Sequence, residues 1–68
     1  MKNTIKAERA KYNLTQAALA DKVNVSRQTI NSIEIGKFIP SALLALKIAT
    51  ILKVQIEDII TLEEKDWH

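Results

Sequence analysis

The fold of this chain is decided by residues 15–37, which read TQAALADKVNVSRQTINSIEIGK. Thr15 is a helix-capping residue type, because its hydroxyl can accept a hydrogen bond from a free backbone N–H group at a helix start. The next eight residues carry apolar side chains that share one stripe of a helix with period 3.6, namely Leu19, Ala20 and Val23. Asn24 then tolerates the left-handed backbone of a sharp turn. The pattern predicts a helix that packs on a core and ends in a tight turn.

A second short helix is predicted directly after that turn. Ser26 can cap it, and Gly36 can end it after about Glu34 or Ile35. Only Ile30 and Ile33 are clearly placed to face a core. The outward positions carry hydrogen-bonding side chains instead, namely Arg27, Gln28, Asn31 and Ser32. A helix with so polar an outer face is a candidate binding element.

The rest of the chain is predicted to be helical as well. Asn3 or Thr4 can cap a helix that runs to about Tyr12, and Asn13 can end it. Gly36 and Pro40 bracket a loop. After it, residues 42–53 are so rich in Leu, Ile and Ala that we expect a mostly buried helix. A brief last helix follows a bend, with anchors at Ile56, Ile59 and Ile60.

Composition limits the classes of function. At 68 residues the chain is expected to form one domain, residues 1–68, with a small core. It has no cysteine, and its one histidine is residue 68, which argues against disulfides, a zinc site and a nucleophilic enzyme. The beginning of the sequence has no apolar run like that of a signal peptide, and no apolar stretch is long enough to span a bilayer. We therefore expect a cytoplasmic protein that is not an enzyme, with no cofactor and no membrane partner.

Charge is distributed unevenly along the chain. Residues 1–37 hold seven Lys or Arg against three Asp or Glu, whereas residues 38–68 hold three against five. The basic half is also the half with the polar outer helix. This polarity favours contact with a phosphate backbone, although a solvated surface explains such a charge distribution equally well when nothing else indicates nucleic acid.

Several motifs at fixed spacing resemble the helix-turn-helix of the Cro/C1-type (XRE) repressor family. They are Leu14-Thr15-Gln16, Leu19-Ala20, the run from Val23 to Ile30, and Ile33-Glu34-x-Gly36-Lys37, followed by Pro40-Ser41, Leu46 to Ala49 and Ile56 to Ile59. The resemblance covers nearly the whole chain and is strongest to short stand-alone repressors of the cytolysin-operon kind. It implies an all-α fold, a compact five-helix lambda-repressor-like DNA-binding domain with the helix-turn-helix at about 16–35.

The resemblance also implies roles for individual residues. The family's arginine at Arg9 pairs with the glutamate at Glu34, and Gln28 occupies a principal base-reading position. By its chemistry Arg27 can bond guanine, Gln28 can bond adenine, and Thr29 can offer a methyl group to thymine. Gln16 would touch a phosphate or brace Gln28. The predicted DNA-binding set is Gln16, Ser26, Arg27, Gln28, Thr29, Asn31, Ser32 and Lys37, of which Gln16, Ser26 and Lys37 fit phosphate contacts.

The expected function is sequence-specific regulation of transcription. A single such helix contacts few base pairs, so we expect a repressor that binds the major groove of a palindromic operator as a homodimer, without a small-molecule ligand. The expected dimer interface is the last helix with the tail: Ile59, Ile60, Leu62 and Trp67. The alternative is an antitoxin or other protein-interaction module whose DNA binding serves a partner protein.

Two segments leave alternatives open. The tail, residues 61–68, is a frayed end, a short strand or arm that pairs with a second copy, or a metal site from Glu63, Glu64 and Asp66. Ile35 and Ile39 stand at positions near the loop where the family commonly has polar or basic residues. Either one phosphate contact of the family is missing here, or these two residues and Phe38 form an apolar patch for a protein partner, or the three pack against one another. The family also usually has Ser or Thr where Gln55 stands, so capping of the last helix is expected to be weaker.

Overall fold

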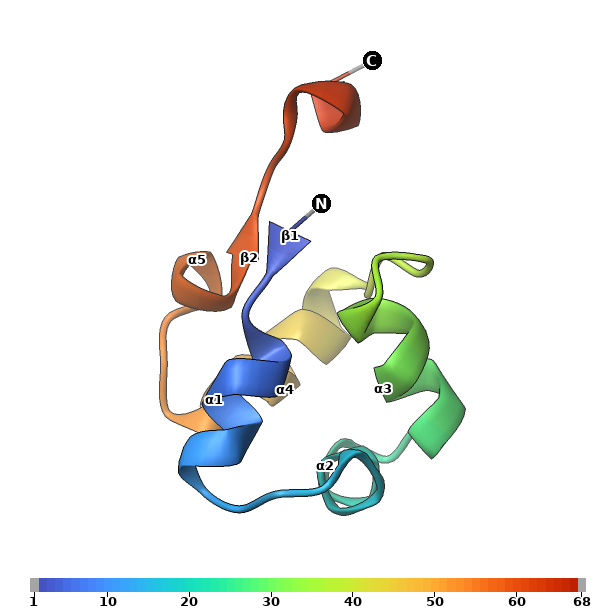
Figure 1. Cartoon of the computed structure of the whole chain (residues 1–68), viewed down its shortest axis with the longest axis vertical. Coiled ribbons are helices and arrows are strands. Elements are labelled where there is room, and N and C mark those ends of the chain that lie inside the picture. The colour runs from blue at the N-terminus through green and yellow to red at the C-terminus, as the bar shows by residue number, and fades with distance from the viewer. Residues whose placement is uncertain (1, 68) are drawn as a thin grey trace.

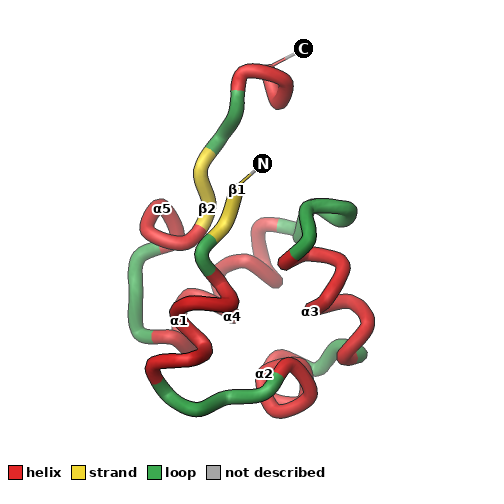
Figure 2. The backbone as a smooth tube through the Cα atoms, viewed as in Figure 1, coloured by secondary structure: helices red, strands yellow, loops and turns green. Residues whose placement is uncertain are grey.

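The computed structural model describes residues 2–67, and it contains five α-helices and a small two-stranded sheet (Figures 1 and 2). Residues 1 and 68, the latter being the end of the expected tail, lie outside this range. The all-α prediction is thus confirmed, with a minor strand component. The elements are β1 Lys2–Asn3, α1 Ile5–Lys11, α2 Gln16–Val23, α3 Arg27–Glu34, α4 Ala42–Leu52, α5 Ile56–Ile59, β2 Ile60–Thr61 and a 3₁₀ turn Glu64–Trp67.

Three helices begin at the hydroxyl caps that the sequence predicts. The side chain of Thr15 accepts from the Ala18 N–H at 3.0 Å, that of Ser26 from Thr29 at 3.1 Å, and that of Ser41 from Leu44 at 3.2 Å. These bonds satisfy backbone donors that have no partner inside the helix. The caps fix where α2, α3 and α4 start, and they therefore fix the orientation of the side chains that follow.

Helix ends are made by residues with left-handed backbone. Asn13, Asn24 and Gly36 have φ values of 54°, 65° and 83°, as expected from the sequence. Lys53 also has a positive φ, 58°, and it ends α4 one residue earlier than predicted. The sequence did not indicate that this lysine ends the helix. The left-handed region is unfavourable for most residue types and is usually occupied by Gly, or by Asn, whose short polar side chain can form a local hydrogen bond.

The core lies where α1, α2, α3, α4 and α5 meet. Its fully buried large side chains are aliphatic and come from all five helices: Ile5, Leu19, Ile30, Ile33, Ile48, Leu52 and Ile59. No polar or charged residue among those described is buried in the core. This hydrophobic cluster holds α2 and α3 in a fixed relation to the rest of the domain.

The expectation that residues 42–53 form a mostly buried helix is wrong. Only one face of α4 is buried, through Ala45, Ile48, Ala49 and Leu52. Leu43 and Leu46 are more than half exposed, because none of the elements within residues 2–67 covers the outer side of α4. Density of apolar residues alone did not distinguish a buried helix from one that leaves an apolar face at the surface.

The two ends of the described chain are tied together. β1 and β2 pair antiparallel, with Lys2 opposite Thr61 and Asn3 opposite Ile60. Thr4 makes two further hydrogen bonds, both to the end of α5. Its backbone N–H donates to the Ile59 carbonyl, and its hydroxyl donates to the Asp58 carbonyl. The strand interpretation of the tail thus applies only to its first residue, Thr61, and the partner is the N-terminal strand of the same chain.

The start of α5 is capped in a different way from the other helices. The Asp58 carboxylate accepts from the Gln55 N–H at 3.1 Å, so an acidic side chain in the helix bonds the backbone N–H of the residue just before it. The residues after β2 run away from the helical body and end in the 3₁₀ turn (Figure 1). Within residues 2–67 no group of acidic or histidine side chains is arranged to hold a metal ion, and no helix is long and apolar enough to cross a membrane.

Candidate nucleic-acid interface

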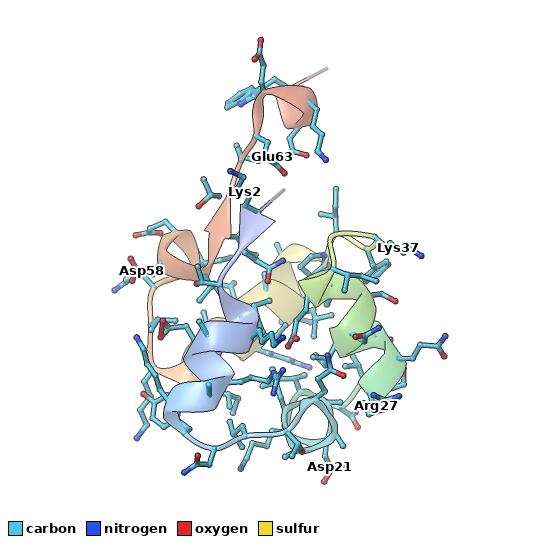
Figure 3. The ribbon with its side chains drawn as sticks, viewed as in Figure 1. Lys2, Asp21, Arg27, Lys37, Asp58 and Glu63 are labelled. Carbon is cyan, nitrogen blue, oxygen red and sulfur yellow. The ribbon has the colours of Figure 1, made fainter. Side chains whose placement is uncertain are left out.

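Helix α3 carries the polar outer face that the sequence predicts. Its inner residues, Ile30 and Ile33, are completely buried against the core. Arg27 and Gln28 are exposed, whereas Thr29, Asn31 and Ser32 are partly covered. Arg27 and Lys37 both extend from the side of the molecule that α3 forms (Figure 3). The helix therefore presents its hydrogen-bonding groups at the surface while two isoleucines fix it from behind.

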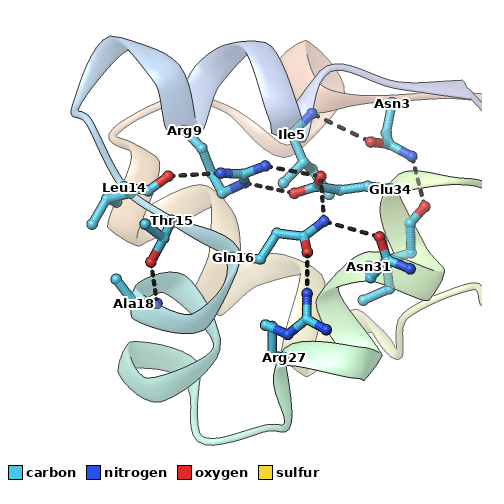
Figure 4. A network of polar contacts seen from close by, with 11 residues as sticks. Asn3, Ile5, Arg9, Leu14, Thr15, Gln16, Ala18, Arg27, Asn31 and Glu34 are labelled. Atoms are coloured by element: carbon cyan, nitrogen blue, oxygen red, sulfur yellow. Dashed lines mark hydrogen bonds and ion pairs between the residues drawn. The ribbon is translucent and has the colours of Figure 1, made fainter.

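Arg9 and Glu34 form an ion pair between α1 and the end of α3 (Figure 4). Arg9 Nε donates to Glu34 Oε2 at 2.7 Å and Arg9 Nη2 donates to Oε1 at 3.1 Å, while Nη1 donates to the Leu14 carbonyl at 2.7 Å. The side chains are only 12% and 5% exposed. The bond to Glu34 outweighs desolvation and raises the pKa of Arg9. This pair fixes the last turn of α3 relative to α1.

Gln16 links that ion pair to the outer face of α3. Its Nε2 donates to Glu34 Oε1 and to Asn31 Oδ1, both at 3.1 Å, and its Oε1 accepts from Arg27 Nη1 at 3.2 Å (Figure 4). Both amide hydrogens of Gln16 are used in this way. Gln16, itself a predicted DNA-binding residue, therefore holds the side chains of two others, Arg27 and Asn31.

Ser26 and Thr29 form a local pair at the first turn of α3. Besides the capping bond, their hydroxyl oxygens lie 3.0 Å apart and share a hydrogen bond. The Ser26 side chain is thus a helix cap, and it also lies at the exposed edge of the interface.

A shallow hollow of about 350 Å³ opens beside α3. It brings together five of the predicted site residues, one of which, Lys37, comes from the loop that follows the helix. The residues that line it are Ser26, Gln28, Thr29, Ser32, Lys37 and Phe38. Phe38 was not among the predicted site residues, although an aromatic residue directly after Lys37 in a Gly-to-Pro loop was a signal that could have indicated it.

Asn3 supports the start of α1, as the sequence predicts for one of two residues, and it also contacts α3, which the sequence did not indicate. Its Nδ2 donates to the Ile33 carbonyl at 2.9 Å, and its Oδ1 accepts from the Ile5 N–H at 3.3 Å. One side chain therefore both supports the start of α1 and reaches across to α3. This contact is a second support, besides Arg9, that joins the N-terminal segment to α3.

The residues predicted for the dimer interface differ in their exposure. Leu62 and Trp67 are 58% and 74% exposed, and they lie in the segment beyond β2. Ile60 is partly buried, and the Ile59 side chain is only 1% exposed because it belongs to the core of its own chain. Ile59 therefore cannot offer its side chain to a partner in this fold, and the prediction for that residue needs correction.

The apolar residues near the loop do not cover one another. Ile35, Phe38 and Ile39 are each about half exposed or more, and Leu43 and Leu46 on α4 are exposed as well. This exposure is what an apolar patch for a partner requires, and any packing of the three side chains against one another leaves about half of each at the surface. These side chains are available as an apolar surface.

Two short helices joined by a left-handed turn, the second with a buried aliphatic face and a polar outer face, define a helix-turn-helix protein. The chain belongs to the helix-turn-helix family of Cro/C1 (XRE) type, whose model matches residues 5–59. This is a family of DNA-binding transcription regulators rather than of enzymes.

Relatives of similar length support the same family. An uncharacterized HTH-type transcriptional regulator of Methanocaldococcus jannaschii is 54% identical over 66 residues, which cover 97% of this chain and all of the relative. The HTH-type regulator YgzD of Bacillus subtilis is 44% identical over 66 residues, again covering 97% of this chain and all of the relative.

Two solved structures have a similar fold. The P22 c2 repressor in complex with a synthetic operator superposes with a TM-score of 0.75 and 30% identity, over 78% of this chain and 80% of that one. The restriction-modification controller protein C.AhdI of Aeromonas hydrophila gives a TM-score of 0.73 and 26% identity, over 79% and 82% of the two chains.

Proposed function

We propose that this protein is a transcriptional repressor that binds an operator with two-fold symmetry as a homodimer and inserts α3 into the major groove. The observation that carries the proposal is the polar outer face of α3, which buried isoleucines and the Arg9–Glu34 pair hold in place from two sides. The match to a repressor whose structure was determined with an operator supports the same function. Binding of chromosomal DNA would take place in the cytoplasm.

The base-reading residues in this proposal are at the exposed side of α3. Arg27 is suited to the O6 and N7 acceptors of guanine, and Gln28 to the N7 acceptor and N6 donor of adenine. Asn31 and Ser32, about one turn further along the helix, extend the set with shorter polar side chains. Gln16 already uses both its amide hydrogens within the protein, which favours a bracing role for it over a side-chain contact to phosphate.

The proposed phosphate contacts are Ser26 and Lys37. Both line the hollow beside α3, at the exposed edges of the interface. Such contacts fix the register of the protein on the duplex without reading its sequence. Because they release counterions, they would make binding strongly dependent on salt concentration.

A homodimer is proposed because one α3 can contact only a few base pairs. Leu62 and Trp67 expose large apolar surfaces in a segment that extends from the body of the domain, and they are the proposed contacts to the second copy. Two copies of α3 would then read half-sites about 34 Å apart, one turn of the double helix.

The test is a binding titration against the DNA upstream of the protein's own gene and against a scrambled duplex, each at two salt concentrations. Light scattering gives the mass of the bound species. We expect a dimer that prefers the upstream DNA, with affinity that falls steeply as salt rises. Equal, weak binding to both duplexes at both concentrations would contradict the proposal.

A second function is favoured by one observation. Ile35, Ile39, Leu43 and Leu46 expose apolar side chains outside the proposed dimer contact, which is the surface that an antitoxin or another interaction module would use for a partner protein. A small protein encoded beside this gene would be the first candidate. A stable complex of the two purified proteins, abolished when Ile39 and Leu43 are changed to Ser, would support this alternative.

A further inference from the structure

We propose that Phe38 forms, with Thr29 and Gln28, an apolar subsite for the C5-methyl group of one thymine in each half-site. The inference depends on the proposed function, since it assigns a specificity contact to the same interface. It adds a residue that lies outside α3 to the set that distinguishes one base pair from another.

The first observation is where the phenylalanine lies. Phe38 lines the same hollow as Gln28, Thr29 and Ser32, so the loop after α3 brings its ring beside the outer face of the helix. Lys37, its neighbour in sequence, lines that hollow as well. A base edge that enters this hollow would therefore lie near both Gln28 and Phe38.

The second observation is that the loop is held in position. The backbone N–H groups of Lys37 and Phe38 both donate to the Ser32 carbonyl, at 2.9 and 3.2 Å. Gly36, with its positive φ, makes this return of the chain possible without strain. The backbone of Phe38 is thus held against the last turn of α3, so the loop is already folded before it contacts DNA.

The third observation is that about half of this phenylalanine lies at the surface. Phe38 is 47% exposed. A half-exposed aromatic ring in an interface for DNA gains stability when an apolar group covers it. The fold leaves that part of the ring to a ligand.

The chemistry of the hollow divides it in two. Ser26 and Lys37 supply polar groups suited to the sugar-phosphate backbone, whereas Phe38 supplies an apolar side chain. The hydroxyl of Thr29 is engaged with Ser26, so its methyl group is what it can offer to a ligand. In the major groove only thymine presents a methyl group, and Phe and the Thr methyl are side-chain groups that contact it.

The test first locates the operator within the bound upstream DNA by footprinting, and then replaces each thymine of that operator in turn by uracil. Uracil keeps every hydrogen-bonding group of thymine and lacks only the methyl. We expect one thymine in each half-site whose replacement weakens binding of the unaltered protein about fourfold, the effect of removing one buried methyl-sized group. With Phe38→Ala, the thymine operator should bind about as weakly as the uracil operator, and uracil at that position should cause little further loss.

Two further variants make the result specific. Phe38→Leu keeps an apolar side chain at the position and should retain part of the discrimination between thymine and uracil. Ile39→Ala removes a neighbouring exposed apolar residue that does not line the hollow, and it should discriminate like the unaltered protein. Thermal melting of each variant confirms that it is folded.

The proposed subsite is contradicted if no single uracil replacement weakens binding of the unaltered protein. It is also contradicted if the Phe38→Ala variant discriminates thymine from uracil as strongly as the unaltered protein does. In either case the operator itself would still be bound, so the proposed function would stand. If the unaltered protein prefers no duplex over a scrambled one, the proposed function fails first, and the subsite fails with it.

Discussion

Gln16 donates a hydrogen bond to Glu34 across 3.1 Å, and this contact joins the start of α2 to the end of α3. The same carboxylate is held by Arg9 from α1. Glu34 is thus a shared acceptor for residues from two other elements, and it lies behind the surface that α3 presents. The ion pair and the proposed interface for DNA therefore belong to one connected hydrogen-bond network, so we expect a change at one member to alter the positions of the others.

The first prediction concerns the Arg9–Glu34 pair. Changing Arg9 to Met should lower the free energy of unfolding by about 3 kcal/mol, because it leaves the Glu34 carboxylate, which is 5% exposed, without its ionic partner. The double variant Arg9→Met/Glu34→Leu should recover part of that loss, since it removes the stranded charge. Urea denaturation at one fixed protein concentration measures both effects.

Another ion pair of α1 provides a control for this prediction. Lys11 Nζ lies 2.9 Å from Glu8 Oε2, but the lysine side chain is 66% exposed. Solvent screens such a pair, so Lys11→Ala should change the free energy of unfolding by less than about 1 kcal/mol. If Arg9→Met and Lys11→Ala lowered the free energy of unfolding equally, burial would not make the Arg9–Glu34 pair more stabilising than the Lys11–Glu8 pair.

The second prediction concerns Gln16. Changing it to Ala removes the bonds that hold Arg27 and Asn31, while the isoleucines beneath α3 stay in place. We expect weaker binding to the operator, with reduced preference at the base pairs that Arg27 and Asn31 contact, and little change in the melting temperature. Competition titrations with operators mutated one base pair at a time report the preference.

An exposed glutamine far from α3 in the sequence serves as the matched control for Gln16. Gln55→Ala changes the residue before α5 and should leave the operator preference unchanged. If Gln16→Ala weakened binding to every duplex by the same factor, its role would be that of a phosphate contact instead of a brace.

The third prediction separates base reading from phosphate contact. Gln28→Ala should relax discrimination at one base pair by about 1 to 3 kcal/mol and leave the salt dependence of binding unaltered. Lys37→Ala should weaken binding to all duplexes alike and reduce the slope of log K against log salt by about 0.9 for each phosphate that the lysine neutralises. Titrations at several salt concentrations against matched and mismatched operators test both variants, and identical behaviour would show that this division of roles is wrong.

Much of the fold was predictable because local signals and the hydrophobic pattern agree. Thr15, Ser26 and Ser41 cap helices, and Asn13, Asn24 and Gly36 end them, as their side-chain chemistry indicates. The hydroxyl caps and left-handed residues act within a few positions along the chain, so the sequence alone contains the necessary information.

The features that were missed depend on contacts between distant residues. Asn3 bonds the carbonyl of Ile33, thirty positions away, and β1 pairs with β2 at the other end of the chain. The exposure of Leu43 and the place of Phe38 beside Gln28 likewise depend on which elements lie over them. No periodicity within a single helix or loop determines such relationships, because they are set by tertiary packing.

The last prediction concerns the dimer. Trp67 is 74% exposed and Leu62 is 58% exposed, so both can change without opening the core of their own chain. The double variant Leu62→Ser/Trp67→Ser should shift the mass measured by light scattering from dimer to monomer and weaken operator binding more than about tenfold, because each half-site then binds separately. The helical circular dichroism signal should be unchanged in the monomer.

The control is Ile59→Ala, which should affect stability and not dimer formation. Removal of this buried side chain should lower the free energy of unfolding by about 2 to 5 kcal/mol, whereas the folded fraction should still form dimers. If the tail variant remains dimeric, the tail is not the interface, and the exposed apolar face of Leu43 and Leu46 on α4 becomes the next candidate.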